Sequence, residues 1–250
     1  MSNFLDYKVD AILQKPDIKE DDLNFLELSG RQSYWSQGYY GQDITVAVID
    51  TGVAPHEVFG DRLLKGRNFN SLYSTPLNSK DDNGHGTHCA GSVAGGYVEG
   101  MKYPVGIAPQ AKILPVKVLD GTGDCKRMSD IVDGINYAIS QNVDIITMSL
   151  SATKLDWGSA FPKLESAIKN AVSKYIIVLA SMGNTSREEI RYPSGFEETT
   201  SVGAVDKDKK LALFSTTGNH CDVCQIGVNV ISSWFEGGYV AMSVHQWVHL

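Results

Sequence analysis

Short apolar runs alternate with amphipathic segments from residue 43 onward, and this alternation constrains the fold more than any other feature of the sequence. Near-continuous runs of valine and isoleucine suit strands that are buried on both faces of a parallel sheet. The runs that predict strands are 44–49, 113–119, 143–150, 176–181 and 201–205.

Two segments between these runs have the period of a helix. Residues 129–141 begin with Ser129, a candidate N-cap, and residues 161–173 place Leu164, Ile168 and Val172 four apart on one face. Strands that alternate with helices predict an α/β fold with a doubly wound, mainly parallel sheet and helices on both faces. Ligands of such folds bind beyond the carboxyl ends of the strands.

The 250 residues fit one domain with a short arm. Residues 1–34 are polar and acidic and are interpreted as an N-terminal arm, with the domain over 35–243. A formal net charge of −7 argues against nucleic acid or an anionic membrane as a partner. The N-terminus does not resemble a secretory signal and no run is long enough to span a membrane, so a cytoplasmic location is expected.

Three polar motifs follow predicted strands or begin a helix. The first is VAVIDTG, in which Asp50 ends a buried strand and needs a dedicated hydrogen-bond partner. An Asp that caps the next turn is the alternative interpretation, and Asp-Thr-Gly alone also occurs in aspartic proteases. This motif does not decide the chemistry by itself.

The second motif is NGHGTHCAG, with His85 between two glycines and His88 three residues later. Two histidines at this spacing are candidate metal ligands, but no third ligand stands at the usual spacing. The flanking glycines favour close backbone packing around a functional His85, with His88 as a buried structural residue. The third motif is ASMGN, in which Asn184 is either a turn residue or an amide donor to a developing oxyanion.

Together, VAVIDTG, NGHGTHCAG and ASMGN resemble in order and spacing the motifs of the subtilisin-like serine proteases, the subtilase family or peptidase S8, closest in style to intracellular subtilisins. The resemblance covers residues 35 to 243. It implies a serine-type endopeptidase in which Asp50 orients the imidazole, His85 is the general base and Asn184 is the oxyanion donor.

The resemblance also implies that a peptide substrate pairs as an added strand between two segments of the chain. These segments are Gly121-Thr122-Gly123 and Ser149-Leu150-Ser151. Ser151 stands where the family usually has Gly, which changes the first specificity pocket. The expected partner is therefore a peptide or protein substrate.

The nucleophile motif Gly-Thr-Ser-Met is missing from its expected place after Ser243. Residues 244–250 instead read VHQWVHL, an aberrant tail. One permitted coding, GTA CAT CAA TGG GTA CAC CTC, reads Gly-Thr-Ser-Met-Gly-Thr-Pro when a single G is placed in front. A one-base frameshift or a sequencing error after the Ser243 codon is the hypothesis, and Ser243 itself is not expected to be the nucleophile.

The expectation for these residues is therefore a C-terminally truncated endopeptidase domain that lacks the family's C-terminal helices and has no activity. The alternative is a pseudoprotease that binds a peptide or a protease partner. A third class, a different α/β hydrolase or a nucleotide binder, lacks both the Gly-x-Ser-x-Gly motif and a phosphate-binding glycine loop.

The sequence indicates no certain cofactor, and the resemblance makes calcium a possible ligand although one usual residue of its site is not matched. The family's calcium site uses an Asp where this chain has Phe59, and Asp61 is the nearest substitute. Cys221 and Cys224 form a C-x-x-C pair without the second pair of a metal site, and Cys89 is interpreted as a small core residue. A second interpretation of the arm, residues 1–34, is a short inhibitory prosegment, as in intracellular subtilisins.

Overall fold

The computed structural model describes residues 5, 7–15, 18, 23, 27–71, 75, 78–101 and 104–244. A parallel sheet has the strand order β3-β4-β2-β5-β6-β7-β8. Its strands are β2 Thr45–Asp50, β3 Arg67–Asn68, β4 Lys112–Lys117, β5 Ile145–Met148, β6 Ile177–Ser181, β7 Thr200–Val205 and β8 Val223–Ile226. All five predicted strands are present, and β3 and β8 are added at the two edges.

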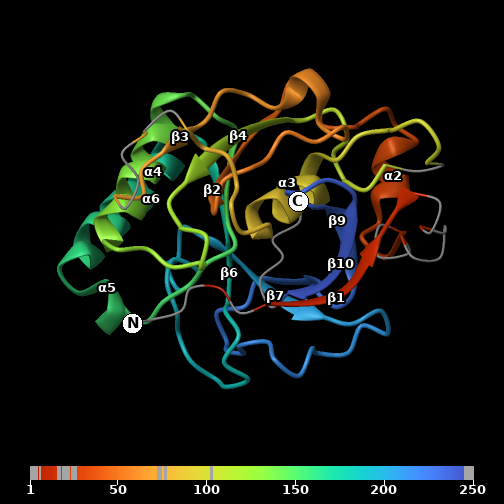
Figure 1. The fold of residues 1–250 in the computed structure, drawn as a ribbon. Helices are drawn as coiled ribbons and strands as arrows, with labels where there is room; N and C mark the ends of the chain where they lie inside the picture. Colours follow the sequence, from red (N-terminus) through yellow and green to blue (C-terminus); the bar gives the residue numbers. More distant parts are fainter. Residues whose placement is uncertain are drawn as a thin grey trace.

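Helices cover both faces of this sheet, as predicted (Figure 1). The longer helices are α3 His85–Ala94, α4 Met128–Ser140 and α6 Phe161–Ser173. The short helical segments are α2 Arg31–Trp35, η3 Gly60–Arg62, α5 Lys154–Trp157 and η4 Gly158–Ala160. In Figure 1, α4 and α6 lie together on one side of the sheet and α3 lies on the other.

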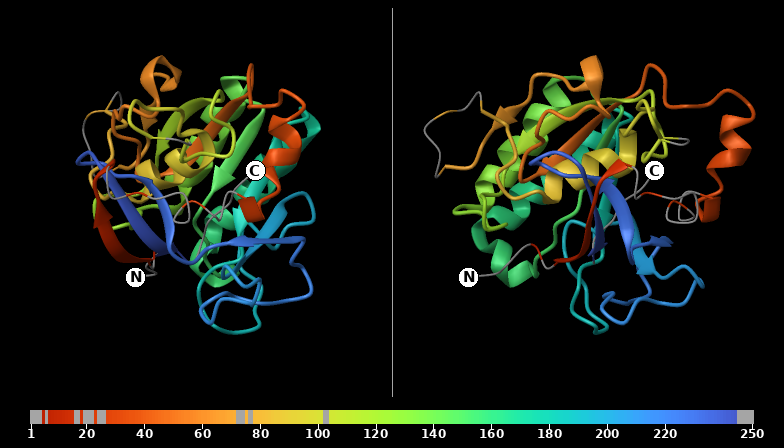
Figure 2. Two further views of the ribbon diagram at one scale, coloured as in Figure 1. Left: turned by 90° about the vertical axis from the view of Figure 1, so that its right-hand side faces the viewer. Right: turned by 45° about the vertical axis from the view of Figure 1, so that its right-hand side comes forward.

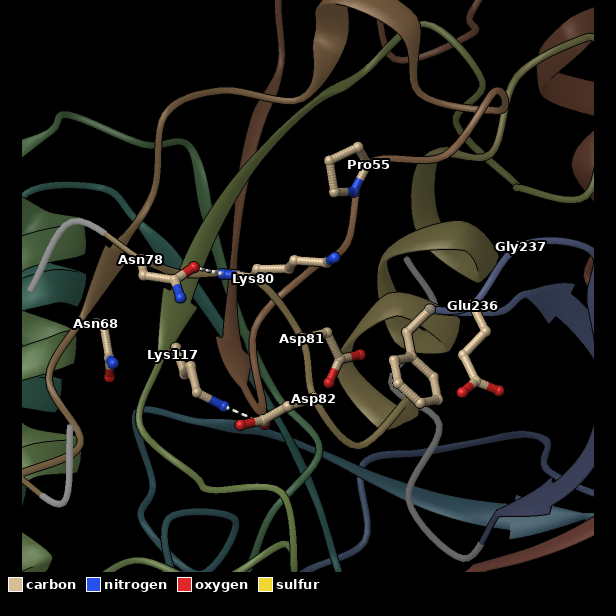
Figure 3. A pocket seen from close by; sticks show the side chains of 10 residues that line it. Pro55, Asn68, Asn78, Lys80, Asp81, Asp82, Lys117, Glu236 and Gly237 are labelled. Atoms are coloured by element: carbon tan, nitrogen blue, oxygen red, sulfur yellow. Dashed lines mark hydrogen bonds and ion pairs between the residues drawn. The ribbon is translucent and has the colours of Figure 1, made fainter. Parts of the chain in front are cut away.

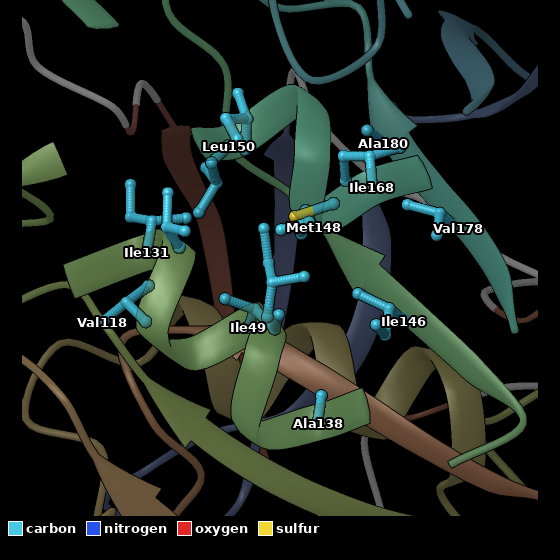
Figure 4. Close-up of a cluster of buried hydrophobic side chains, with 14 of the residues drawn as sticks. Ile49, Val118, Ile131, Ala138, Ile146, Met148, Leu150, Ile168, Val178 and Ala180 are labelled. Atoms are coloured by element: carbon cyan, nitrogen blue, oxygen red, sulfur yellow. The ribbon is translucent and has the colours of Figure 1, made fainter. Parts of the chain in front are cut away.

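The core between the sheet and α4 and α6 is built from aliphatic side chains (Figure 4). Its members include Ile49, Val118, Ile131, Ile146, Met148, Leu164, Ile168 and Val178. Two details of the helix prediction are wrong. Arg127, not Ser129, is the N-cap of α4, and Val172 is 36% exposed at the end of α6, where Ala171 is buried instead.

The opposite face packs against α3, whose ten residues are all buried. Small residues in α3 allow the segment that contains β9 to approach this helix closely. A Cβ on Gly91 would lie 2.3 Å from the hydroxyl oxygens of both Ser232 and Ser233. The helix that begins at His85 is therefore enclosed on every side, which fixes the position of its first residue.

A second, antiparallel sheet has the order β1-β10-β9, with β1 Tyr7–Leu13, β9 Val230–Ser233 and β10 Tyr239–Val244. Figure 2 shows β1 alongside β10, although the two strands come from opposite ends of the sequence. Lys15, just after β1, forms an ion pair of 2.5 Å with Glu57. Part of the predicted arm is thus a strand of the fold, a feature that the sequence did not predict.

Candidate active site

Predicted site residues from four motifs come together because they follow adjacent strands of one parallel sheet. Gly121 to Gly123 come after β4, Asp50 ends β2, Ser149 to Ser151 follow β5, and Asn184 follows β6. The strand order β4-β2-β5-β6 places these ends side by side. In addition, β4 pairs with one side of β2 and β5 with the other. This reversal of strand order at β2 is a topological switch point, the place where ligands bind in such sheets.

Asp50 and His85 form a buried pair at the centre of this edge. The Nδ1 atom of His85 lies 2.8 Å and 3.0 Å from the two carboxylate oxygens of Asp50. Asp50 is 0% and His85 is 1% exposed. Burial alone lowers the pKa of His85, but the charge of Asp50 and its hydrogen bond prevail and hold that pKa well above its ordinary value.

Asp81 fixes the loop that leads into α3, and sequence reasoning missed this residue. One carboxylate oxygen accepts hydrogen bonds from the Thr51 hydroxyl and from the backbone N–H groups of Asn83 and Gly84. The other accepts from the backbone N–H and the hydroxyl of Thr87. Asp81 therefore connects the end of β2 to the first turn of α3, on either side of the Asp50–His85 pair.

The glycines on either side of His85 are required by close packing, as the sequence suggested. Gly84 has φ 112°, and a Cβ there would lie 2.2 Å from the Trp234 ring. A Cβ on Gly86 would lie 2.1 Å from the carbonyl oxygen of Gly52. Any larger residue at either position would displace the start of α3.

His88 points away from the site. It is fully buried, and its Nε2 atom lies 3.1 Å and 3.0 Å from the carbonyl oxygens of Val230 and Val240. The ring therefore joins α3 to β9 and β10, which agrees with a structural role.

Cys89 lies one helical turn after His85, with its Sγ 3.7 Å from His85 Nδ1 and 3.8 Å from an Asp50 oxygen. Burial raises the pKa of this thiol. Among the described residues, Asp50, His85 and Cys89 are the group of acidic, His and Cys side chains close enough to share a metal ion. Within this group, Asp50 and His85 are hydrogen-bonded to each other.

The loop before Asn184 is held in a left-handed conformation at Gly183, where φ is 101°. The Gly183 carbonyl accepts from the Thr216 backbone, and the Thr185 N–H donates to the Thr216 hydroxyl. Asn184 is half-buried between these anchored neighbours. The turn that carries the Asn184 side chain is thus fixed by hydrogen bonds on both sides, just after the carboxyl end of β6.

Both segments expected to flank a peptide are ordered. The Asp120 carboxylate accepts from the backbone N–H and the hydroxyl of Thr122, at 2.8 Å and 2.6 Å. The Gly121 carbonyl accepts from the side-chain amide of Asn83, two residues before His85 in the sequence. Ser149, Leu150 and Ser151 are each at most 3% exposed.

The N-terminal arm contacts the Asp50–His85 site and one of the two segments expected to flank a peptide. The Tyr7 ring lies 5.6 Å from the His85 ring between centroids, and its hydroxyl donates to the Asn83 side chain at 3.1 Å. Leu5 is 4% exposed, and a Cβ on Gly123 would lie 2.8 Å from its Cδ1. The arm therefore covers both the imidazole and one segment of the expected peptide site.

Ser243 is engaged elsewhere. On β10, its hydroxyl donates to Asp10 at 2.6 Å and accepts from the backbone N–H of Asn229. No hydrogen bond joins it to His85 in the described part of the chain. This geometry supports the prediction that Ser243 is not the nucleophile. The frameshift hypothesis depends on residues 244–250, of which residues 245–250 lie outside the described residues.

A polar cavity of about 650 Å³ lies beside the site (Figure 3). Lys117, at the end of β4, extends beneath it, and its Nζ donates to Asp82 and to the carbonyls of Thr51 and Leu119. The charge of this buried lysine is thereby fully hydrogen-bonded. Its bond to the carbonyl of Thr51 supports the turn that follows Asp50.

The residues at the family's calcium position do not fit a calcium ion. Phe59 is 1% exposed and supplies no oxygen ligand, and Asp61 lies exposed in η3. We therefore assign calcium no step in the reaction proposed below.

Cys221 and Cys224 lie close together at the far edge of the sheet, with 3.7 Å between their sulfur atoms. Burial raises the pKa of Cys221 to about 11. Both cysteines are free thiols, and they are remote in the strand order from the ends of β2 and β5.

The sequence is similar to those of known proteins. The family model described as the subtilase family, peptidase S8, matches residues 41–246. The major intracellular serine protease of Bacillus subtilis is 36% identical over 206 residues, which are 80% of this chain and 62% of that protein. The intracellular serine protease of Paenibacillus polymyxa is 36% identical over 225 residues, 87% of this chain and 66% of that protein.

A solved structure gives the same result for the fold. The crystal structure of a cold adapted subtilisin-like serine proteinase aligns with a TM-score of 0.71 at 29% identity, over 83% of this chain and 71% of that one. The chain spans less than two thirds of the length of the two intracellular proteases. Within the described residues, no helix is long and apolar enough to cross a membrane.

Proposed function

This chain belongs to the subtilase family, and we propose that its cleft is the peptide-binding and proton-transfer part of a serine endopeptidase site. The observation that carries the proposal is the buried contact between Asp50 and the Nδ1 atom of His85. A carboxylate in this position fixes the tautomer in which Nε2 is unprotonated and can accept a proton.

Each remaining group has a role in the proposed reaction. His85 accepts the proton of an attacking hydroxyl and returns it to the leaving amine, while Asp50 stabilises the imidazolium formed in between. Asn184 donates a hydrogen bond to the oxyanion of the tetrahedral intermediate. The substrate is a peptide or protein in extended form, paired with the backbones of residues 121–123 and 149–151.

The attacking hydroxyl is absent from these 250 residues in its family position. Ser243 is held by Asp10, and residues 244–250 contain no serine. We therefore expect negligible peptide hydrolysis from this chain. Removal of the nucleophile from subtilisin, a member of the same family, lowers kcat about 10⁶-fold.

The arm has a role of its own in this proposal, as a short prosegment. Leu5 and Tyr7 cover Gly123 and His85, so a substrate has to displace them before it reaches the imidazole. Pairing of β1 with β10 holds the arm in place. We place the protein in the cytoplasm because its relatives are described as intracellular proteases, and we assign it neither nucleic acid nor a membrane as a partner.

A fluorophosphonate probe, which labels activated serines, tests the proposal. The chain should remain unlabelled, and sequencing of the locus should find codons that read Gly-Thr-Ser-Met when one G is inserted after the Ser243 codon. The protein made from the corrected gene should then be labelled, and His85→Ala should abolish that labelling. Labelling of the 250-residue chain at any serine, or a corrected protein that reacts without His85, contradicts the proposed chemistry.

A further inference from the structure

Arg191 spans two segments that would surround the substrate residue at the scissile bond. Its Nε donates to the Ser151 hydroxyl at 2.9 Å, and its Nη2 donates to the Ser151 carbonyl at 3.0 Å. A Cβ on Gly183 would lie 2.6 Å from the Ser151 hydroxyl and 2.7 Å from Arg191 Cδ. The side chain of Arg191 therefore lines the space between the end of β5 and the turn that carries Asn184.

The backbone of Arg191 is fixed in this position. The next residue, Tyr192, exchanges two backbone hydrogen bonds with Ala152, at 2.9 Å and 3.0 Å. The Tyr192 ring packs against Phe161 and Phe196, each at 4.7 Å between centroids. The guanidinium is thus built into the wall of the cleft rather than carried on a mobile loop.

The guanidinium is largely buried and only partly neutralised. The Arg191 side chain is 13% exposed, and its Nη1 donates to Glu189 at 3.0 Å. These contacts use three of the five N–H donors of the group, and no other hydrogen-bond acceptor for it exists among the described residues. Glu189 is itself 31% exposed, so solvent weakens its hold on the cation.

A substrate side chain that enters this space meets a buried cation with unused donors. A carboxylate restores the hydrogen bonds that the guanidinium loses when water is excluded. An aromatic side chain removes the water and offers no acceptor, which leaves a desolvated charge. The Ser151 hydroxyl further narrows the space where the family usually has Gly.

We propose that Arg191 is the specificity-determining residue of the cleft and selects an acidic side chain, Glu or Asp, on the substrate residue that precedes the scissile bond. This proposal rests on the proposed function, because it assumes that a peptide lies between residues 121–123 and 149–151. Arg191 acts on substrate choice and takes no part in proton transfer.

Equilibrium binding tests the proposal in the chain as it exists, because peptides are not cleaved when the nucleophile is absent. Fluorescein-labelled peptides of sequence Ala-Ala-Pro-Xaa-Ala, with Xaa as Glu, Gln or Phe, are titrated and followed by fluorescence anisotropy. The same titrations are made with Tyr7→Ala, in which the arm covers His85 less. The Glu peptide should bind about tenfold tighter than the Gln peptide, as expected for a charge-assisted hydrogen bond, and the Phe peptide most weakly.

Two variants separate the charge of Arg191 from its packing. Arg191→Gln should remove the preference for Glu over Gln, whereas Arg191→Lys should retain part of it. Glu189→Gln leaves Arg191 in place and removes its competing carboxylate, so the Glu peptide should bind several-fold tighter and the Gln peptide should be unaffected. Glu188→Gln is the matched control, because Glu188 is exposed and does not contact Arg191.

The outcomes distinguish this inference from the function on which it rests. If the Phe peptide binds most tightly and Glu189→Gln changes nothing, the specificity assignment is wrong while the peptide cleft stands. If none of the peptides binds either chain, the proposed cleft is wrong and the assignment falls with it.

Discussion

Tyr7 lies against His85, with 5.6 Å between the two ring centroids and with its hydroxyl bonded to Asn83. The first described residues of the chain therefore cover the imidazole proposed as the general base. Burial of Tyr7 in this position also raises the pKa of its own hydroxyl.

Replacement of Tyr7 by Ala should uncover His85. Diethyl pyrocarbonate acylates accessible imidazoles, so His85 should react several-fold faster in Tyr7→Ala than in the parent chain. His88, buried between α3 and the second sheet, should stay protected in both. Tyr34→Ala, which removes an exposed tyrosine far from the cleft, is the control. Equal His85 reactivity in all three proteins, measured by peptide mass spectrometry, would show that the arm does not shield the site.

Loss of the Asp81 carboxylate should strongly destabilise the fold. Asp81→Ala leaves buried donors of the Gly84 and Thr87 backbone without their acceptor, and such groups cost about 1–3 kcal/mol each. We expect the free energy of unfolding in urea to fall by about 3 kcal/mol or more. Asp61→Ala, at an exposed position in η3, should change it by less than about 0.5 kcal/mol. Similar losses in both variants would contradict the role given to Asp81.

His56 should make the fold sensitive to acid. Burial lowers its pKa below the ordinary value, although its Nε2 lies 2.9 Å from the Gly238 carbonyl. The unfolded chain therefore takes up a proton near pH 6.5 while the folded chain does not, so stability is lost as the pH falls from that value toward the folded-state pKa. Urea unfolding between pH 7 and 5 should show a steeper loss for the parent chain than for His56→Gln. If the free energy of unfolding depended on pH equally in both proteins, His56 would not be the source of the acid sensitivity.

The cysteines should differ in their rates of alkylation. Burial raises the pKa of Cys221 to about 11 and that of Cys125 to about 12. Cys89 is buried, and its pKa is raised as well. Cys224 is exposed and should react with iodoacetamide first at pH 8. Cys89 should react only after unfolding. Early modification of Cys89 in the folded chain, seen by mass spectrometry, would mean that the Asp50–His85 site is accessible to solvent.

The strands and the proposed site were predictable because each rests on a local pattern. The apolar runs require burial on both faces, so they specify strands of a parallel sheet. Asp50 ends one such strand and Asn184 comes shortly after another, and parallel strands end at the same edge. Glycines around His85 indicated close packing, which Gly84 and Gly86 confirm.

The features that were missed depend on contacts between distant residues. Strand β1 alternates Tyr7, Val9 and Ala11 with Lys8 and Asp10, but its side chains are mostly exposed. It is a strand because its backbone pairs with β10 from the other end of the sequence, which the local pattern does not show. Asp81 is one carboxylate in a polar loop, and nothing in its local sequence marks the five donors that converge on it. The contact between Arg191 and Ser151 joins residues 40 positions apart.

The most direct test of the account is the protonation of His85 itself. Its ring signals, assigned by NMR with a His85→Gln chain as reference, should titrate with a midpoint above the ordinary value near 6.5. In Asp50→Asn that midpoint should fall below the ordinary value, because burial then acts without a neighbouring carboxylate. A midpoint that is ordinary in the parent chain, or unchanged by Asp50→Asn, would mean that the two residues are not the proton-transfer pair of a serine peptidase.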